Sequence, residues 1–179
     1  MTEVYVRVKG LSFLEFTGPR PKLLADLFNQ MGVIKVGVDE DRNISLFNQG
    51  EIFFITNPCS GGNAEYFRKI HVRGTCSMGF KVEDSQKAYE LALELGAEPA
   101  NVTDYPIPAV QGVGDSLIYL VDEDKEAELF AMFDFIKPTT AYPGITYLQR
   151  IDHLTHNLHI GNLERMCNFY ERVFGFKRI

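Results

Sequence analysis

The chain has 179 residues, of which 45% are hydrophobic and 23% charged, and its formal net charge is −6. This composition is typical of a folded protein with one substantial core or two small ones. The acidic balance argues against a nucleic-acid partner, which usually leaves a basic patch in the sequence. No apolar run approaches the ~20 residues of a membrane-spanning helix, and the N-terminus lacks the apolar segment of a secretory signal. We therefore expect a cytoplasmic protein with no membrane partner.

The first part of the chain predicts one strand, one helix and three further strands. An alternating run, GLSFLEF from Gly10, precedes a polar break and the amphipathic helix KLLADLFNQM, for which Gly32 is the expected stop. Three strand-like runs follow around Lys35, from Ile44 and from Glu51, and a tight turn, NQG, separates the last two. This order is a βαβββ unit.

A second unit follows after a short helix that is expected from Ala64. Its first strand is SMGFKV from Ser77, and Asp84 is the expected N-cap of a helix that stops at Gly96. Three prolines weaken the strand signals that come next, but DSLIYLVD from Asp115 is a good final strand. We expect residues 1–150 to form a domain of two units that ends in a linker at about 134–150.

Residues 151–179 read as the start of a third unit, with a strand at IDHLTHNL and a helix from the N-cap Asn162 to Gly175. Gly10 to Gly32 and His153 to Gly175 both span 22 positions, so the first and third segments align without a gap. The middle segment, with Ser77 opposite Gly10, needs a three-residue deletion. Repeats of this kind constrain a fold strongly. Because the third unit stops after one helix, we expect a fragment of a longer protein.

Three histidines in the last segment form H-x-x-H-x-x-H, namely His153, His156 and His159. On a strand, residues i and i+3 point to opposite faces, and residues i and i+6 lie about 20 Å apart at ~3.3 Å per residue. At most one of the three can then bind a given metal. His153 shares a face with the small polar residues Thr155 and Asn157, as a metal ligand in a water-accessible pocket would. A lone histidine is weak evidence for a metal, so spacing alone favours a hydrogen-bonded or exposed side chain.

The strings IDHLTHNL and NFYERVFGF resemble the opening of the catalytic domain of 4-hydroxyphenylpyruvate dioxygenases. GLSFLEF, QGEIFFITN, VEDSQKAYELALELGAEP and GDSLIYLVD resemble the N-terminal domain of the same family, in the expected order. The resemblance implies an α+β fold of the vicinal-oxygen-chelate type, in which two βαβββ units form a half-barrel, followed here by the start of a third unit.

The resemblance also implies an Fe(II) site in the C-terminal domain, held by two histidines and one carboxylate with positions open to substrate and O2. The first histidine matches His153, and Thr155 would line the substrate pocket. The other two ligands would lie beyond Ile179. Gly10 and Ser77 take the place of His153 in the first two repeats, so residues 1–150 are expected to be a scaffold that binds no iron.

By the same resemblance, the whole enzyme would convert 4-hydroxyphenylpyruvate and O2 to homogentisate with loss of CO2, in tyrosine breakdown, as a dimer or tetramer. This chain alone is expected to be inactive and free of iron. Three alternatives remain open at this point: a hydroxymandelate synthase-like dioxygenase, a fusion with an unrelated catalytic domain, and a metal-free protein of the bleomycin-resistance type that binds small aromatic molecules between the two units.

Overall fold

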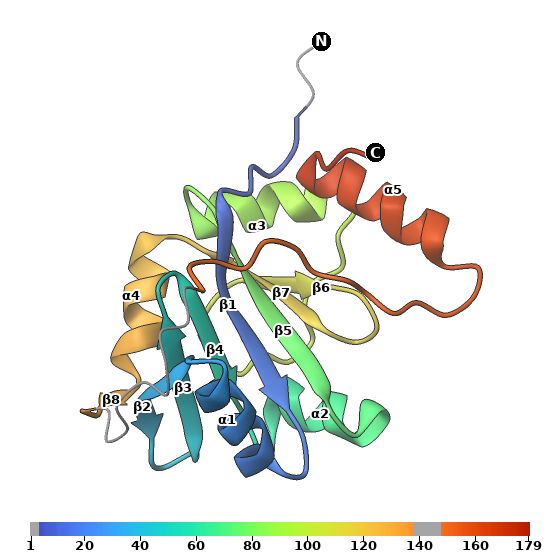
Figure 1. The fold of residues 1–179 in the computed structure, drawn as a ribbon. Coiled ribbons are helices and arrows are strands. Elements are labelled where there is room, and N and C mark those ends of the chain that lie inside the picture. Colours follow the sequence, from blue (N-terminus) through green and yellow to red (C-terminus); the bar gives the residue numbers. More distant parts are fainter. Residues whose placement is uncertain (1–3, 138–147) are drawn as a thin grey trace.

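One curved mixed sheet organises the computed structural model, which describes residues 4–137 and 148–179. Its eight strands have the order β6-β7-β5-β1-β4-β3-β2-β8, and five helices surround them (Figure 1). The antiparallel pair β1 and β5 lies in the middle, and each of these strands has a parallel neighbour on its other side, β4 and β7 respectively. Two similarly connected halves therefore meet at the centre of the sheet. This confirms the α+β fold with two duplicated units.

The first half has the complete βαβββ order that the sequence predicts. Its elements are β1 (Gly10–Thr17), α1 (Pro21–Gln30), β2 (Ile34–Asp39), β3 (Ile44–Gln49) and β4 (Ile52–Thr56). α1 starts at a proline, which is favoured there because the first N–H groups of a helix have no partner within it. The helix packs on the sheet through Phe28, whose ring lies 4.7 Å from that of Phe54 and 5.4 Å from that of Phe47.

The second half follows the same order with one reduced strand. Its elements, after the connecting helix α2 (Gly62–His71), are β5 (Gly74–Lys81), α3 (Ser85–Glu94), β6 (Ala109–Gln111) and β7 (Leu117–Val121). Asp84 caps α3 as predicted, since its carboxylate accepts a hydrogen bond from the Lys87 backbone N–H at 2.9 Å. The expected strand between α3 and β6 shrinks to a single bridge between Pro99 and Val110. Proline has no N–H to donate to a sheet, which explains the loss.

Two elements after β7 were not predicted. α4 (Glu123–Ala131) begins after Asp122, whose carboxylate accepts from the Lys125 N–H at 2.9 Å. β8 (Asp134–Phe135) then pairs antiparallel with β2. The sheet therefore extends into the first residues of the expected linker at 134–150. Residues 138–147 of that linker lie outside the described residues.

The last segment forms the predicted helix but not the predicted strand. α5 (Leu163–Phe174) ends at Gly175 in the left-handed conformation. Residues 151–158 are irregular, and their half-buried side chains are Ile151, Leu154 and Leu158, which do not alternate as those of a strand would. No strand of the described chain pairs with them. Alternation of apolar and polar residues predicts which side chains are buried when a segment is paired in a sheet. It does not predict whether a neighbouring strand is there to pair with.

α5 packs on the core that the first two units build. Val173 and Phe174 are buried there, and the Phe80 ring of β5 lies 5.2 Å from that of Phe174. The Val6 N–H donates to the Val173 carbonyl at 2.8 Å, so the N-terminal segment and α5 lie side by side (Figure 1). Residues 151–179 are thus attached to the N-terminal core in this structure.

The strands correct the alignment of the three repeats. β1 begins at Gly10 and β5 at Gly74, with φ angles of 156° and 153°. The glycine after each helix, Gly32 or Gly96, lies 22 positions further on with a positive φ, and Gly175 lies 22 positions after His153. Gly74 rather than Ser77 is therefore the counterpart of Gly10, and the middle repeat needs no deletion.

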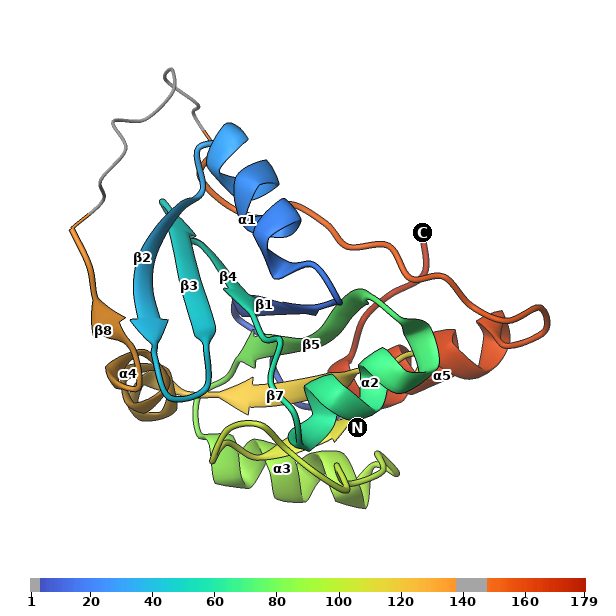
Figure 2. The same cartoon turned by 90° about the horizontal axis from the view of Figure 1, so that it is seen from below.

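Each face of the sheet carries its own core. α1, α3 and α5 pack on one face, with Phe28, Ala92 and Val173 among the buried residues. The other face buries Phe13, Tyr105 and Tyr119, together with Leu129 of α4. Seen from below, the strands curve from β2 through β1 to β7 (Figure 2).

Candidate functional site

The predicted metal ligand, His153, lies on the surface in the irregular segment before α5. Its side chain is 77% exposed, and its Nδ1 lies 3.0 Å from Oδ2 of the adjacent Asp152. The His153 ring holds the pKa of that carboxyl below its usual value through this hydrogen bond. Thr155, predicted to line the substrate pocket, is exposed as well. Because the segment is not a strand, the shared strand face that grouped these two residues is absent.

The remaining histidines do not converge on His153. His156 lies beside Tyr170 of α5, with 3.5 Å between Nε2 and the tyrosine hydroxyl. His159 is exposed. His71, at the end of α2, has its Nε2 2.9 Å from Oδ2 of Asp115. The H-x-x-H-x-x-H spacing therefore does not form a three-histidine site.

The side chains of the described chain do not fit an iron site by themselves. Within residues 4–137 and 148–179, no three His, Cys, Asp or Glu side chains are grouped to hold a metal ion. The counterparts of His153 in the first two repeats are Gly10 and Gly74, which have no side chain to offer. An iron(II) centre of the two-histidine, one-carboxylate kind would need further ligands beside His153.

A buried carboxylate occupies the middle of the sheet instead. Glu15 of β1 is fully buried and lies opposite Ser77 of β5. Three side chains donate hydrogen bonds to it: the Ser77 hydroxyl at 2.5 Å, the Tyr105 hydroxyl at 2.7 Å and the Asn57 amide at 2.8 Å. Burying a charge is costly unless hydrogen bonds compensate, and these three donors do so. We call Glu15, Asn57, Ser77 and Tyr105 the Glu15 cluster.

A second carboxyl group, Asp104, lies next to the Glu15 cluster. Its Oδ2 accepts from the Ala64 N–H at 2.9 Å, in the first turn of α2. Its own N–H donates to the Tyr119 hydroxyl at 2.9 Å. Burial, together with the nearby charge of Glu15, raises the pKa of Asp104 to about 7. The side chain thus changes its protonation near neutral pH.

The Glu15 cluster and its aromatic neighbours fill the face where a half-barrel could offer a groove between its units. The Phe13 ring lies 6.0 Å from that of Tyr105 and 5.8 Å from that of Tyr119. All three rings are buried. The cluster therefore joins β1, β5 and two loops within a closed core rather than at an open site.

Sequence reasoning missed the Glu15 cluster, although one signal was present. In GLSFLEF the glutamate takes an inward position of an alternating strand, where an apolar residue is the rule. Its donors come from residues 42 to 90 positions away in the chain. Contacts over such separations follow from the fold and not from local patterns.

The duplicated strand order places the chain in the class of paired βαβββ half-barrels. It belongs, more specifically, to the family described as "Hydroxyphenylpyruvate dioxygenase, HPPD, N-terminal", whose model matches residues 3–136. Within the described residues, no helix has the length and apolar character that crossing a bilayer requires.

Two curated relatives cover almost the whole chain. A 4-hydroxyphenylpyruvate dioxygenase of Pseudomonas sp. (strain P.J. 874) is 38% identical over 176 residues, and one of Legionella pneumophila (strain Corby) is 37% identical over 173 residues. Both matches include 95% of this chain and 49% of the relative. The chain thus spans about half the length of the curated relatives that it matches.

One solved structure is similar over 98% of the chain. It is a "xylose isomerase-like TIM barrel/4-hydroxyphenylpyruvate dioxygenase fusion protein", with a TM-score of 0.86 and 25% sequence identity, and the match covers 28% of that chain. The fold of this chain is thus found as one part of a longer fusion protein.

Proposed function

We propose that this chain supplies the N-terminal half of an Fe(II)-dependent dioxygenase that converts 4-hydroxyphenylpyruvate and O2 to homogentisate and CO2 in tyrosine breakdown. The observation that carries the proposal is the identity of 37–38% to two such dioxygenases along 95% of the chain. A match of that extent continues beyond residue 136 into the segment that contains His153.

In this proposal His153 is one of the two histidine ligands, Thr155 lines the substrate pocket, and the remaining ligands come from the half of the relatives that this chain does not span. The metal would supply the redox chemistry of the reaction. The chain's own part is to hold His153 in place. Ile151 and Leu154, on either side of it, pack against the main core, and α5 anchors the segment from its other end.

Residues 1–150 act in this proposal as a scaffold without iron. Gly10 and Gly74 support this role, because they replace the histidine of the third repeat with residues that cannot coordinate a metal. The filled face around the Glu15 cluster counts against aromatic molecules being held on that face, as a metal-free binder with a groove between the units would hold them. We also infer a cytoplasmic homo-oligomer without a membrane partner. The net charge of −6 argues against a nucleic-acid partner.

Two alternatives, one in the reaction and one in the domain arrangement, fit the same half-barrel. A hydroxymandelate synthase-like enzyme would differ in residues of the other half. A fusion with an unrelated catalytic domain has a precedent in the TIM-barrel fusion protein, whose printed name describes that arrangement. Analysing the product formed from 4-hydroxyphenylpyruvate would identify a hydroxymandelate synthase-like enzyme. Sequencing the whole gene would identify a fusion.

The test compares two histidine variants of the full-length gene product. We expect His153→Ala to lose bound iron and to lower homogentisate formation by at least about a hundredfold, because one of three protein ligands is removed. His159→Ala is the matched control, since it removes an exposed histidine six positions away and should leave both readouts unchanged. Iron is measured by elemental analysis and homogentisate by chromatography. A His153→Ala enzyme with full iron content would refute the assignment.

A further inference from the structure

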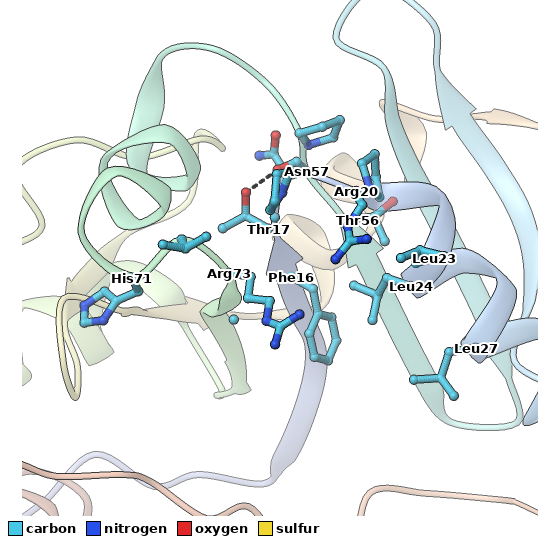
Figure 3. Close-up of a pocket in the computed structure, with 16 residues that line it drawn as sticks. Phe16, Thr17, Arg20, Leu23, Leu24, Leu27, Thr56, Asn57, His71 and Arg73 are labelled. Atoms are coloured by element: carbon cyan, nitrogen blue, oxygen red, sulfur yellow. Dashed lines mark hydrogen bonds between the residues drawn. The ribbon is translucent and has the colours of Figure 1, made fainter.

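A cavity of about 770 Å³ opens between α1 and the turn that joins α2 to β5, away from the histidine segment, and of the Glu15 cluster only Asn57 lines it (Figure 3). One wall is apolar and consists of Phe16 at the end of β1 and three leucines of α1, Leu23, Leu24 and Leu27. Leu23 is 56% exposed and Leu27 48% exposed. Pockets for small organic molecules are typically about 300–1,000 Å³ and mostly apolar with a few polar groups.

The charged side chains that line this cavity are two arginines. Its lining includes Arg20, Arg73 and His71 but neither an aspartate nor a glutamate, in a chain whose net charge is −6. In Figure 3, Arg20 and Arg73 extend toward the side of the cavity where Phe16 lies. Two guanidinium groups of like charge therefore share one apolar cavity.

Arg20 and Arg73 have no ion pair with any residue of 4–137 or 148–179, whereas other basic side chains nearby are engaged. Arg68 donates to the Thr17 hydroxyl, the Asn57 carbonyl and the Cys59 carbonyl. His71 contacts Asp115. The two free guanidinium groups are thus the ones available to an anion, and guanidinium groups match carboxylates in shape and charge.

The backbone that presents Arg73 is strained. Val72 has a φ of 66°, a conformation that β-branched residues rarely adopt. The same turn brings the Arg73 side chain against Gly18, where a Cβ would lie 3.2 Å from Cβ of Arg73. Strained residues cluster at binding sites, because the surrounding fold must hold them in place.

We propose that this cavity binds a small aromatic carboxylic acid. The carboxylate contacts Arg20 and Arg73, and the ring lies on the apolar wall of Phe16, Leu24 and Leu27. The proposal does not depend on the dioxygenase reaction, because no residue of 148–179 lines the cavity.

The experiment is a titration of the ¹⁵N-labelled 179-residue chain with 3-phenylpropanoate, followed by amide chemical shifts. We expect saturable shifts in α1 and in residues 71–74. 3-Phenylpropan-1-ol keeps the ring but lacks the charge, and acetate keeps the charge but lacks the ring. Each should bind at least about tenfold more weakly than the aromatic acid, since each loses one of the two contacts.

Two variants test the role of the arginine. Arg73→Gln should weaken 3-phenylpropanoate binding by about tenfold or more, because a hydrogen bond between charges is lost. Arg165→Gln removes an exposed arginine of α5 outside the cavity and should bind like the parent chain. Unchanged shifts in the rest of the spectrum show that each variant is folded. The proposal is overturned if no shift saturates, if the alcohol binds equally well, or if the same residues shift on protein dilution without the acid, which would mark a contact between two copies.

Discussion

Glu15 shows how one residue can link distant parts of this fold. Its carboxylate is fully buried in the described structure and depends on hydroxyl and amide donors rather than on a cation. Such a group stabilises the fold only while its donors remain, because a buried acceptor that loses a partner carries the full desolvation cost.

The donor from Tyr105 can be removed without changing the shape of the ring. We expect Tyr105→Phe to lower the free energy of unfolding by about 1.5–3 kcal/mol, the range for a hydrogen bond to a charged group. Tyr66→Phe removes the hydroxyl of an exposed tyrosine on α2 and should change stability by less than about 0.5 kcal/mol. Urea unfolding followed by circular dichroism measures both. Equal stabilities for the two variants would show that the Tyr105 bond contributes nothing.

Asp104 gives the fold a pH dependence of opposite sign to that of most carboxylates. Its folded-state pKa of about 7 lies above the ordinary value, so the folded protein holds the proton more tightly than the unfolded chain. The stability that depends on this proton is fully present below about pH 4 and falls as pH rises to about 7, by up to about 1.4 kcal/mol per unit.

Asp104→Asn should abolish this dependence, because an amide does not ionise. We expect the variant to gain stability relative to the parent chain as the pH rises from 5 to 8, in urea unfolding series recorded at each pH. If the two stability curves run parallel across that window, Asp104 does not hold the proton that its burial indicates.

At the scale of elements, local patterns predicted most of what the structure contains. The strands of the first unit, α1, α3 and α5, and the glycines that follow them were all visible as periodicity with a stop signal. α4 was missed even though Asp122 and the acidic residues after it form an ordinary helix start. Asp122 was expected at the end of a strand, and no element was predicted between that strand and the linker at 134–150.

The predictions that were wrong concern segments whose structure depends on pairing with a neighbouring strand. Residues 151–158 have the alternation of a strand, but a strand exists only when another one pairs with it, and their neighbours in this structure are side chains of the main core. Likewise, the counterpart of Gly10 was placed at Ser77 because the sequence pattern of the second strand is clearest there. The start of β5 at Gly74 follows from its pairing with β1.

The attachment of α5 to the main core can be measured directly. Phe174 is buried while Phe176, two positions on, is 43% exposed, so the two phenylalanines form a matched pair. We expect Phe174→Ala to lower the free energy of unfolding by about 3–5 kcal/mol. Phe176→Ala should cost about 1 kcal/mol, as an ordinary partly exposed substitution does. Similar small losses for both would mean that α5 is not docked on the core in solution.

At the scale of the whole molecule, the repeats differ in whether they offer a side chain that can bind iron. The first two repeats have glycine where the third has His153, and their shared face is filled by the Glu15 cluster and its aromatic neighbours. One imidazole alone holds iron(II) weakly, since the facial triad needs two more protein ligands.

We therefore expect the 179-residue chain, loaded with Fe(II) under reducing conditions and then dialysed, to keep well below one iron per chain and to form no homogentisate. The full-length gene product, treated in the same way, should keep about one iron per chain and should form homogentisate. Stoichiometric iron on the short chain that disappears in His153→Ala would contradict this expectation and would identify a complete site within the sequence given.

The pairing of β8 with β2 has a consequence for how copies of the chain behave toward one another. A strand at the end of a sheet presents unpaired N–H and C=O groups that can recruit the same strand of another molecule. β8 pairs with β2 at Gly37 and Val38, and the Ile136 N–H donates to the Val36 carbonyl just beyond. The opposite edge of the sheet is β6, which has only three residues. A chain cut before Asp134 would uncover the longer strand, so the few residues of β8 protect the protein against edge-to-edge aggregation.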